Sequence, residues 1–169
     1  MFRHILLIKI FFEAFSKGSR IFFIGAGTSG RLGILEAAEC PPTFGTSPNK
    51  IVGLIAGGNR ATFRAIEGAE DSKINSRDDL IKKGFSKNDL LIGISASATT
   101  NYVISAINYA KRINSKTIFI ACNKQKHRIS DFDLILDVGP EFVAGSTRLK
   151  SGTITKNVLN IVTTTAMIK

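Results

Sequence analysis

The sequence has few of the residues that carry metal or redox chemistry. Among 169 residues there are two cysteines, two histidines, four prolines and no tryptophan. Cys40 and Cys122 are too few for a disulfide scaffold, so a reducing compartment is expected. Neither His4 nor His127 has metal-ligand spacing with a cysteine. The sequence therefore predicts no metal site.

Long apolar runs are also missing. The first thirteen residues are rich in Ile, Leu and Phe, but Lys9 interrupts them and no small-residue cleavage site follows. This pattern is typical of a buried helix rather than a signal peptide. No stretch reaches the roughly 18 apolar residues that a membrane-spanning helix needs. We therefore expect a cytoplasmic protein with no membrane partner.

Acidic residues are in deficit. Lys and Arg number 23 against 13 for Asp and Glu, which gives a formal net charge of +10. Such an excess favours anionic partners, from phosphorylated metabolites to nucleic acid. The basic residues are scattered, with no arginine run, aromatic platform or helix-turn-helix segment, so no nucleic-acid partner is predicted.

What the sequence does contain is a regular alternation of strand and helix patterns. Five short runs rich in Ile and Phe are continuously apolar, as parallel strands covered on both faces need to be. The expected strands are 20–24, 50–56, 89–95, 116–121 and 133–138, and the expected helices after the first are 31–40, 60–70, 76–83, 101–113 and 147–168. The predicted fold is an α/β three-layer sandwich with a parallel sheet flanked by helices.

The length and the two ends bear on domain organisation. A chain of 169 residues, 44% apolar and 21% charged, fits a single globular domain. The last predicted helix runs to residue 169 without a stop signal, and the first begins at residue 1. We expect one domain over residues 1–169 that is part of a longer protein.

A glycine-rich loop follows the first predicted strand and opens a helix. It reads Gly-Ala-Gly-Thr-Ser-Gly-Arg over residues 25–31. Its glycines, Gly27 among them, allow a tight turn, and its amides together with Thr28 and Ser29 suit an anion. The same letters match a dinucleotide fingerprint, but the first acidic residue after the second strand is Glu67, too late to hold a ribose. A plain tight turn is the remaining alternative.

A second loop, residues 95–100, lies between a strand and a helix and is rich in hydroxyls. Ser95, Ser97 and Thr100 converge on a helix N-terminus, which suits a phosphate. Ordinary N-capping needs only one hydroxyl, so it is the simpler alternative. The two loops together favour phosphate.

Carboxylates supply a candidate acid and base. Glu39 precedes Pro41 and Pro42, which we expect to end its helix, and a helix C-terminus favours a protonated carboxyl. Glu67 and Glu70 are three apart on one predicted helical face, so repulsion favours a basic carboxylate there. Solvated surface glutamates are the alternative for both.

The chain resembles a known family over nearly its whole length from about residue 12. Residues 25–45, which end in Glu-Cys-Pro-Pro-Thr-Phe-Gly, are similar to the signature of N-acetylmuramic acid 6-phosphate etherases, which are sugar isomerase (SIS) domain enzymes. The similarity continues through 52–58, 67–71 and 145–153. The resemblance implies an SIS fold and cleavage of the D-lactyl ether of N-acetylmuramic acid 6-phosphate, with no cofactor.

The resemblance also implies roles for individual residues. Glu39 matches the family's acid and Glu70 its base. The remaining matches bind the phosphorylated amino sugar: Gly27, Thr28, Ser29, Ser95, Ser97, Thr100 and Ser146. Because SIS domains commonly pair, a homodimer is expected.

The second loop departs from the family pattern. Ala98 and Thr99 stand where the family has glycine and arginine, and Asn101 and Asn59 also differ. Loss of a glycine and of a guanidinium predicts weaker phosphate binding. The alternative function is a non-catalytic sugar-phosphate regulator, as in SIS-domain regulatory proteins related to this family, although such a protein would not need both carboxylates. An aldose-ketose isomerase is disfavoured because Glu-Cys-Pro-Pro is not that group's pattern.

Overall fold

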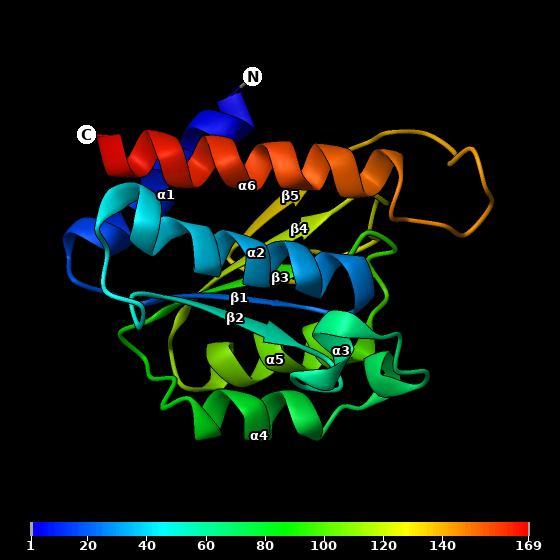
Figure 1. Ribbon diagram of the computed structural model, residues 1–169, viewed down its shortest axis with the longest axis horizontal. Coiled ribbons are helices and arrows are strands. Elements are labelled where there is room, and N and C mark those ends of the chain that lie inside the picture. The colour runs from blue at the N-terminus through cyan, green and yellow to red at the C-terminus, as the bar shows by residue number, and fades with distance from the viewer. Residues whose placement is uncertain (1, 169) are drawn as a thin grey trace.

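The computed structural model describes residues 2–168 and contains a five-stranded, wholly parallel sheet in the order β2-β1-β3-β4-β5 (Figure 1). The strands are β1 (Ile21–Gly25), β2 (Ile51–Ile55), β3 (Leu90–Ile94), β4 (Lys116–Ala121) and β5 (Phe132–Ile135). The helices are α1 (Phe2–Ser16), α2 (Gly27–Phe44), α3 (Arg60–Phe63), η1 (Ala69–Asp71), α4 (Asn75–Lys82), α5 (Asn101–Arg112) and α6 (Lys150–Ile168).

The sheet is apolar on both faces, as the continuous runs predict. Every residue of β1 and β3 is buried. Because side chains alternate across a strand, Phe23 joins one core and Phe22 the other. Two separate hydrophobic cores follow, one on each side of the sheet.

Helices cover both faces of the sheet. In Figure 1, α1, α2 and α6 lie on one side and α4 and α5 on the other. Leu7 and Phe11 of α1 are fully buried in the first core, and Tyr102 of α5 is fully buried in the second. The three-layer prediction is confirmed. The expected buried first helix is buried along one side only, since its Ile5 is 58% exposed.

The expected stop at Pro41 and Pro42 is wrong. Both prolines lie inside α2, which continues to Phe44 and ends at Gly45 in a left-handed conformation. Proline lacks an N–H but has a helical φ, and its carbonyl still accepts, as the 2.9 Å bond from Gly45 N to Pro41 O shows. Glu39 therefore lies five residues before the helix end, and the argument from the helix terminus loses its basis.

The expected helix over 60–70 is also wrong. It is interrupted after α3, where Arg64 is extended, and resumes only as the single 3₁₀ turn η1. Two residues have backbone conformations outside helical space, Arg64 at φ −137° and Gly68 at φ +71°. Glu67 and Glu70 do not share one continuous helix. The last helix likewise begins at Lys150 rather than residue 147.

The strand order determines where a ligand crevice can form. The chain crosses from β1 outward to β2 and later from β3 to β4 in the opposite direction. Ligands of open α/β sheets bind at such a switch point, beyond the carboxyl ends of the strands. Gly25 of β1 is the register partner of Ile94 of β3, so the two candidate loops start side by side.

Candidate active site

The first loop packs very tightly against the end of the sheet. A Cβ on Gly30 would lie 2.6 Å from Ile55 Cγ1 and 2.8 Å from Gly25 O. A Cβ on Gly25 would lie 2.6 Å from Gly30 N. These distances exclude any side chain, so the two glycines let α2 begin directly against β1 and β2.

The second loop brings its hydroxyls together. Ser95 is buried, and its Oγ lies 2.8 Å from Thr100 Oγ1 and 3.4 Å from Ser97 Oγ. Thr99 joins the group, because its Oγ1 donates to Ser97 Oγ at 3.1 Å. Ala98 is fully buried with φ +64°, so the turn here takes a conformation that favours glycine.

The helix N-termini at the two loops have no internal partner of negative charge. The N-caps of α2 and α5, Ala26 and Thr100, make no side-chain capping hydrogen bond, and neither helix has an acidic residue in its first turn. Free N–H groups and the positive end of the helix dipole favour an anion. The two helix N-termini therefore begin beside each other at the switch point, in an arrangement that favours an anionic ligand.

The N-terminus of α6 is different, because Glu141 occupies it. Glu141 accepts bonds of 2.9 Å from the backbone amides of Lys150 and Ser151. Hydrogen bonding by the Ser151 amide lowers the pKa of Glu141 from its usual value. The first turn of α6 reaches the first loop, since a Cβ on Gly152 would lie 3.4 Å from Thr28 Cγ2.

Ser146 lies in the turn that leads into α6. It is half-buried, and its amide donates to Val143 O at 3.0 Å. Thr28 and Ser29 are half-buried and Gly27 is exposed on the first loop. The first turn of α6 therefore brings the Ser146 segment to the same edge of the sheet as the two loops.

A pocket of about 210 Å³ connects the first loop with the segment that follows β2. Gly27 and Arg31 line one wall, and Glu67 and Glu70 line the opposite one. Both glutamates are exposed, so either carboxylate can meet a ligand held at the first loop. Glu70 therefore shares a pocket with the first loop.

Glu39 is not at this pocket. It is exposed on α2, twelve residues beyond Gly27, which is roughly 18 Å along a helix at its usual rise. It shares one helical face with Leu35, which is 44% exposed. Within one chain, Glu39 and Glu70 do not flank a common ligand.

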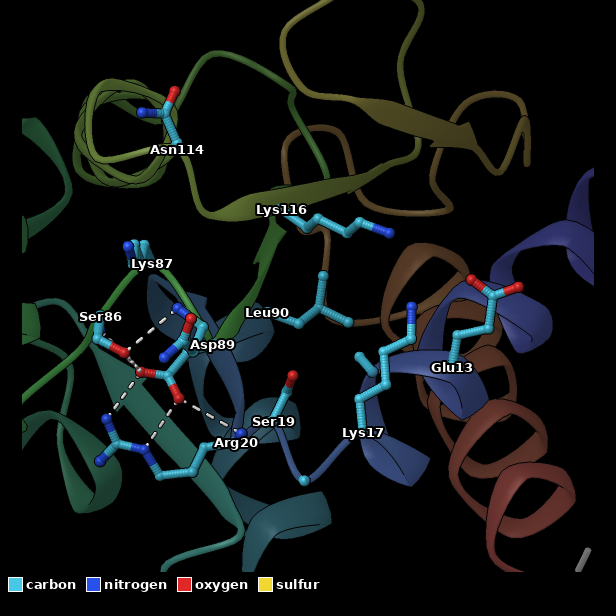
Figure 2. A pocket seen from close by; sticks show the side chains of 13 residues that line it. Glu13, Lys17, Ser19, Arg20, Ser86, Lys87, Asp89, Leu90, Asn114 and Lys116 are labelled. Carbon is cyan, nitrogen blue, oxygen red and sulfur yellow. Dashed lines mark hydrogen bonds and ion pairs between the residues drawn. The ribbon is translucent and has the colours of Figure 1, made fainter.

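A larger cavity lies at the opposite end of the sheet, where the strands begin. It measures about 760 Å³ and surrounds the starts of β1 and β3 (Figure 2). Asp89 accepts from Arg20 Nη2 at 2.7 Å and from Ser86 N at 2.7 Å. Burial acts to raise the pKa of Asp89, but the hydrogen bonds from Arg20 and Ser86 outweigh it and lower the pKa from its usual value.

Two of the three lysines that line this cavity have a structural explanation. Lys17 follows the C-terminus of α1, and Lys116 lies close to the C-terminus of α5, after Asn114. A helix C-terminus carries partial negative charge, which a nearby ammonium complements. This end lacks the free helix N-termini of the opposite one. We therefore assign the cavity to the structural network of Arg20 and Asp89.

Two negative findings concern residues 2–168 as a whole. Within this described part there is no group of three or more His, Cys, Asp or Glu side chains placed to hold a metal ion. None of its helices combines the length and apolar character required to span a lipid bilayer.

The structure adds residues that sequence reasoning did not single out. Arg31 spans from α2 to the carbonyls of Thr62 and Arg64, at 3.0 and 3.1 Å. Glu141 caps a helix that begins nine residues later, a spacing outside the local capping patterns. An arginine beside the glycine loop was visible in the sequence, but its acceptors are backbone atoms 31 and 33 residues away.

The fold and the two helix N-termini without side-chain caps define a class: a doubly wound α/β protein whose switch point favours an anionic ligand. The model of a family described as the glucokinase regulatory protein N-terminal SIS domain matches residues 5–111. The chain belongs to this SIS-domain family.

Similar proteins agree with this assignment. The chain is 54% identical over 160 residues to the N-acetylmuramic acid 6-phosphate etherase of Lactococcus lactis subsp. cremoris strain MG1363, covering 92% of this chain and 53% of that protein. It is 52% identical over 158 residues to the enzyme of the same name from Alkaliphilus metalliredigens, covering 92% and 52%. The chain thus spans about half the length of the curated relatives it matches.

Solved structures share the fold. A putative phosphosugar isomerase from Bacteroides fragilis superposes with a TM-score of 0.72 at 18% identity, covering 99% of this chain and 79% of that one. A phosphoheptose isomerase from Neisseria gonorrhoeae gives 0.70 at 16% identity, covering 100% and 87%. At these identities the likeness shows the architecture alone.

Proposed function

We propose that the chain is the sugar-phosphate-binding part of an N-acetylmuramic acid 6-phosphate etherase of the cytoplasm. The observation that carries this proposal is the pocket between Gly27 and Glu70, next to two uncapped helix N-termini. The relatives at 54% and 52% identity carry this name and support it. The products would be D-lactate and N-acetylglucosamine 6-phosphate.

The phosphate would bind at the second loop. Its Ser95 Oγ lies 2.8 Å from Thr100 Oγ1 and 3.4 Å from Ser97 Oγ, and the N-cap of α5 makes no side-chain capping bond. Hydroxyls and amides can each donate to a phosphate oxygen. Holding this remote group orients the reacting carbons, which is a recognised source of rate acceleration.

Glu70 would act as the base. In an open-chain sugar the aldehyde acidifies the C2 proton, and a carboxylate beside the first loop can remove it. The lactyl oxygen on C3 leaves with a proton from an acid. Water then adds to the double bond between C2 and C3, which restores the hydroxylated sugar.

Glu39 would supply the acid from a second copy of the chain. It lies too far along α2 to serve its own pocket, and it shares an exposed face with Leu35. Further apolar side chains are exposed on the same layer of helices, namely Ile5, Leu6, Ile161 and Ile168. Such a surface fits a symmetric dimer in which each copy completes the site of the other.

The proposal is tested by D-lactate release from N-acetylmuramic acid 6-phosphate. Glu70→Gln should abolish turnover and retain binding of the sugar phosphate by calorimetry. Asp71→Asn is the matched control, because Asp71 is exposed next to Glu70 and does not line the pocket. A folded wild-type protein that neither binds the substrate nor releases lactate would refute the proposal.

Subunit mixing tests the shared site. Glu39→Gln and Glu70→Gln should each be inactive alone. Random mixing places one intact site in half of the dimers, so activity should return to about one quarter of the wild-type value. No recovery in a sample that sediments as a mixed dimer would exclude the role of the second copy.

A regulatory function is the second candidate, because the matching family model is named after glucokinase regulatory protein. Saturable sugar-phosphate binding by the wild-type chain without any lactate release would favour it.

A further inference from the structure

The segment that carries Glu70 has little of its own to hold it in place. Of residues 59–72, which include α3 and η1, Ala61 alone is buried. Phe63 is 87% exposed and Ile66 is 37% exposed. Core packing therefore holds Ala61 near the start of the segment and Ala69, which is half-buried against the second core beside Glu70. The stretch between them, residues 63–68, is exposed, so its placement needs another cause.

Hydrogen bonds within the segment are local. Its backbone bonds in the described structure join residues three or four apart, such as Arg64 N to Arg60 O and Asp71 N to Gly68 O. These bonds shape the turns of the segment but do not attach it to the sheet. Close packing helps, since a Cβ on Gly57 would lie 3.2 Å from both Ala61 Cβ and Ile66 Cβ.

Arg31 makes the hydrogen bonds that join this segment to the rest of the site. Its Nε donates to Thr62 O at 3.0 Å and its Nη2 donates to Arg64 O at 3.1 Å. These carbonyls lie at the C-terminal end of α3, where unsatisfied carbonyls and negative partial charge favour a cation. The planar guanidinium can reach both acceptors at once, which an ammonium group cannot do in the same way.

Arg31 also belongs to the other wall of the pocket. It lies four residues after Gly27 on α2, so the two share one helical face, and both line the 210 Å³ pocket opposite Glu70. One half-buried side chain thus connects the helix that opens the first loop with the segment that presents the carboxylate.

We propose that Arg31 is a positioning residue that fixes the Glu70 segment against the first loop. The catalytic consequence of this inference rests on the proposed function, but the attachment of the segment by Arg31 does not depend on it. Arg31 acts through backbone carbonyls and not on the substrate. Its loss should therefore lower kcat with little change in KM, because phosphate binding at the second loop stays intact.

Amide hydrogen exchange tests whether Arg31 holds residues 59–72 in place. In Arg31→Ala, amide exchange across residues 59–72 should rise roughly tenfold, since two charge-assisted hydrogen bonds are lost. Arg31→Lys should give a smaller rise. Arg64→Ala is the matched control, because it removes a nearby exposed arginine side chain and keeps the carbonyl that Arg31 binds. Unchanged exchange in a folded Arg31→Ala protein would overturn the proposal.

Kinetics test the positioning role. Arg31→Ala should lower kcat for lactate release by about tenfold or more, with KM changed by less than about threefold. Added guanidinium ion should restore part of this loss in Arg31→Ala and none in Glu70→Gln. Faster exchange with an unchanged kcat would refute positioning. If the wild-type chain releases no lactate, the proposed function fails, and exchange alone still decides whether Arg31 holds the segment.

Discussion

Asp89→Asn tests whether the Arg20 and Asp89 contacts beside the large cavity, at the end of the sheet where the strands begin, stabilise the fold. Asp89 is 6% exposed and accepts from Arg20 and Ser86 through both carboxylate oxygens. Asparagine keeps one acceptor and replaces the other with an NH₂ group. In either orientation, the new NH₂ faces a donor, since both oxygens now receive N–H groups.

The expected loss follows from these contacts. A charge-assisted hydrogen bond contributes about 1.5–3 kcal/mol, and a buried donor without a partner costs about 1–3 kcal/mol. Solvent offsets part of the loss because the Arg20 side chain is 32% exposed. We expect a decrease of roughly 2–4 kcal/mol in the free energy of unfolding, or roughly 4–16 °C in Tm for a chain of this size.

Urea unfolding followed by circular dichroism measures this change. The exposed Asp71→Asn should stay within about 0.5 kcal/mol of wild type. Activity per folded molecule should be the same in Asp89→Asn as in wild type, because the network is at the opposite end of the sheet from the pocket that contains Glu70. An unfolding free energy within about 1 kcal/mol of wild type would refute the structural account, as would a selective loss of turnover.

Three further predictions concern close packing, thiol chemistry and acid stability. Gly30→Ala should lower the free energy of unfolding by about 2 kcal/mol or more, because the new Cβ would lie 2.6 Å from Ile55 Cγ1. Gly27→Ala should lower it by only about 1 kcal/mol, because the site is open and only the positive φ is unfavourable; equal losses in urea unfolding would contradict this. Burial raises the pKa of Cys40 to about 12, and the charges of Glu36 and Glu39 add to this effect. Iodoacetamide should therefore label Cys40 of the native protein only slowly at pH 8, as followed by mass spectrometry, and rapid labelling would contradict this. Because the pKa of Asp89 is lowered in the folded protein, its contribution to stability is complete above the ordinary value of 3.8 and is lost as the pH falls through the folded value. The difference in unfolding free energy between wild type and Asp89→Asn should therefore shrink in acid, and a difference that grew would contradict this.

The sequence predicted the sheet well because its strands are buried on both faces. A strand such as Leu90–Ile94 has no solvent side, so a continuous apolar run is its direct signature. Helix boundaries were less predictable. Proline normally indicates a helix end because its missing N–H removes a bond to residue i−4, but its φ is helical and its carbonyl still accepts, so α2 continues through Pro41 and Pro42 to Phe44.

The site was predicted in part. The two loops follow strands that turned out to be neighbours, so Gly27 and Ser95 could be assigned to one edge of the sheet from topology rules. The placement of Glu39 was not predictable, because a carboxylate in a motif carries no information on whether it faces its own pocket. The role of Glu141 at α6 was equally hidden.

The amino-acid sequence by itself determined the layers, the anion-favouring loops and the resemblance to an etherase, since each depends on local pattern and residue type. Only the tertiary structure decided which side chains meet. It separated Glu39 from Glu70, brought Arg31 to carbonyls about thirty residues away and paired Arg20 with the buried Asp89 where the strands begin. The physical reason is that hydrogen bonds and burial depend on distances in space, which a chain of 169 residues sets only when its helices pack on the sheet.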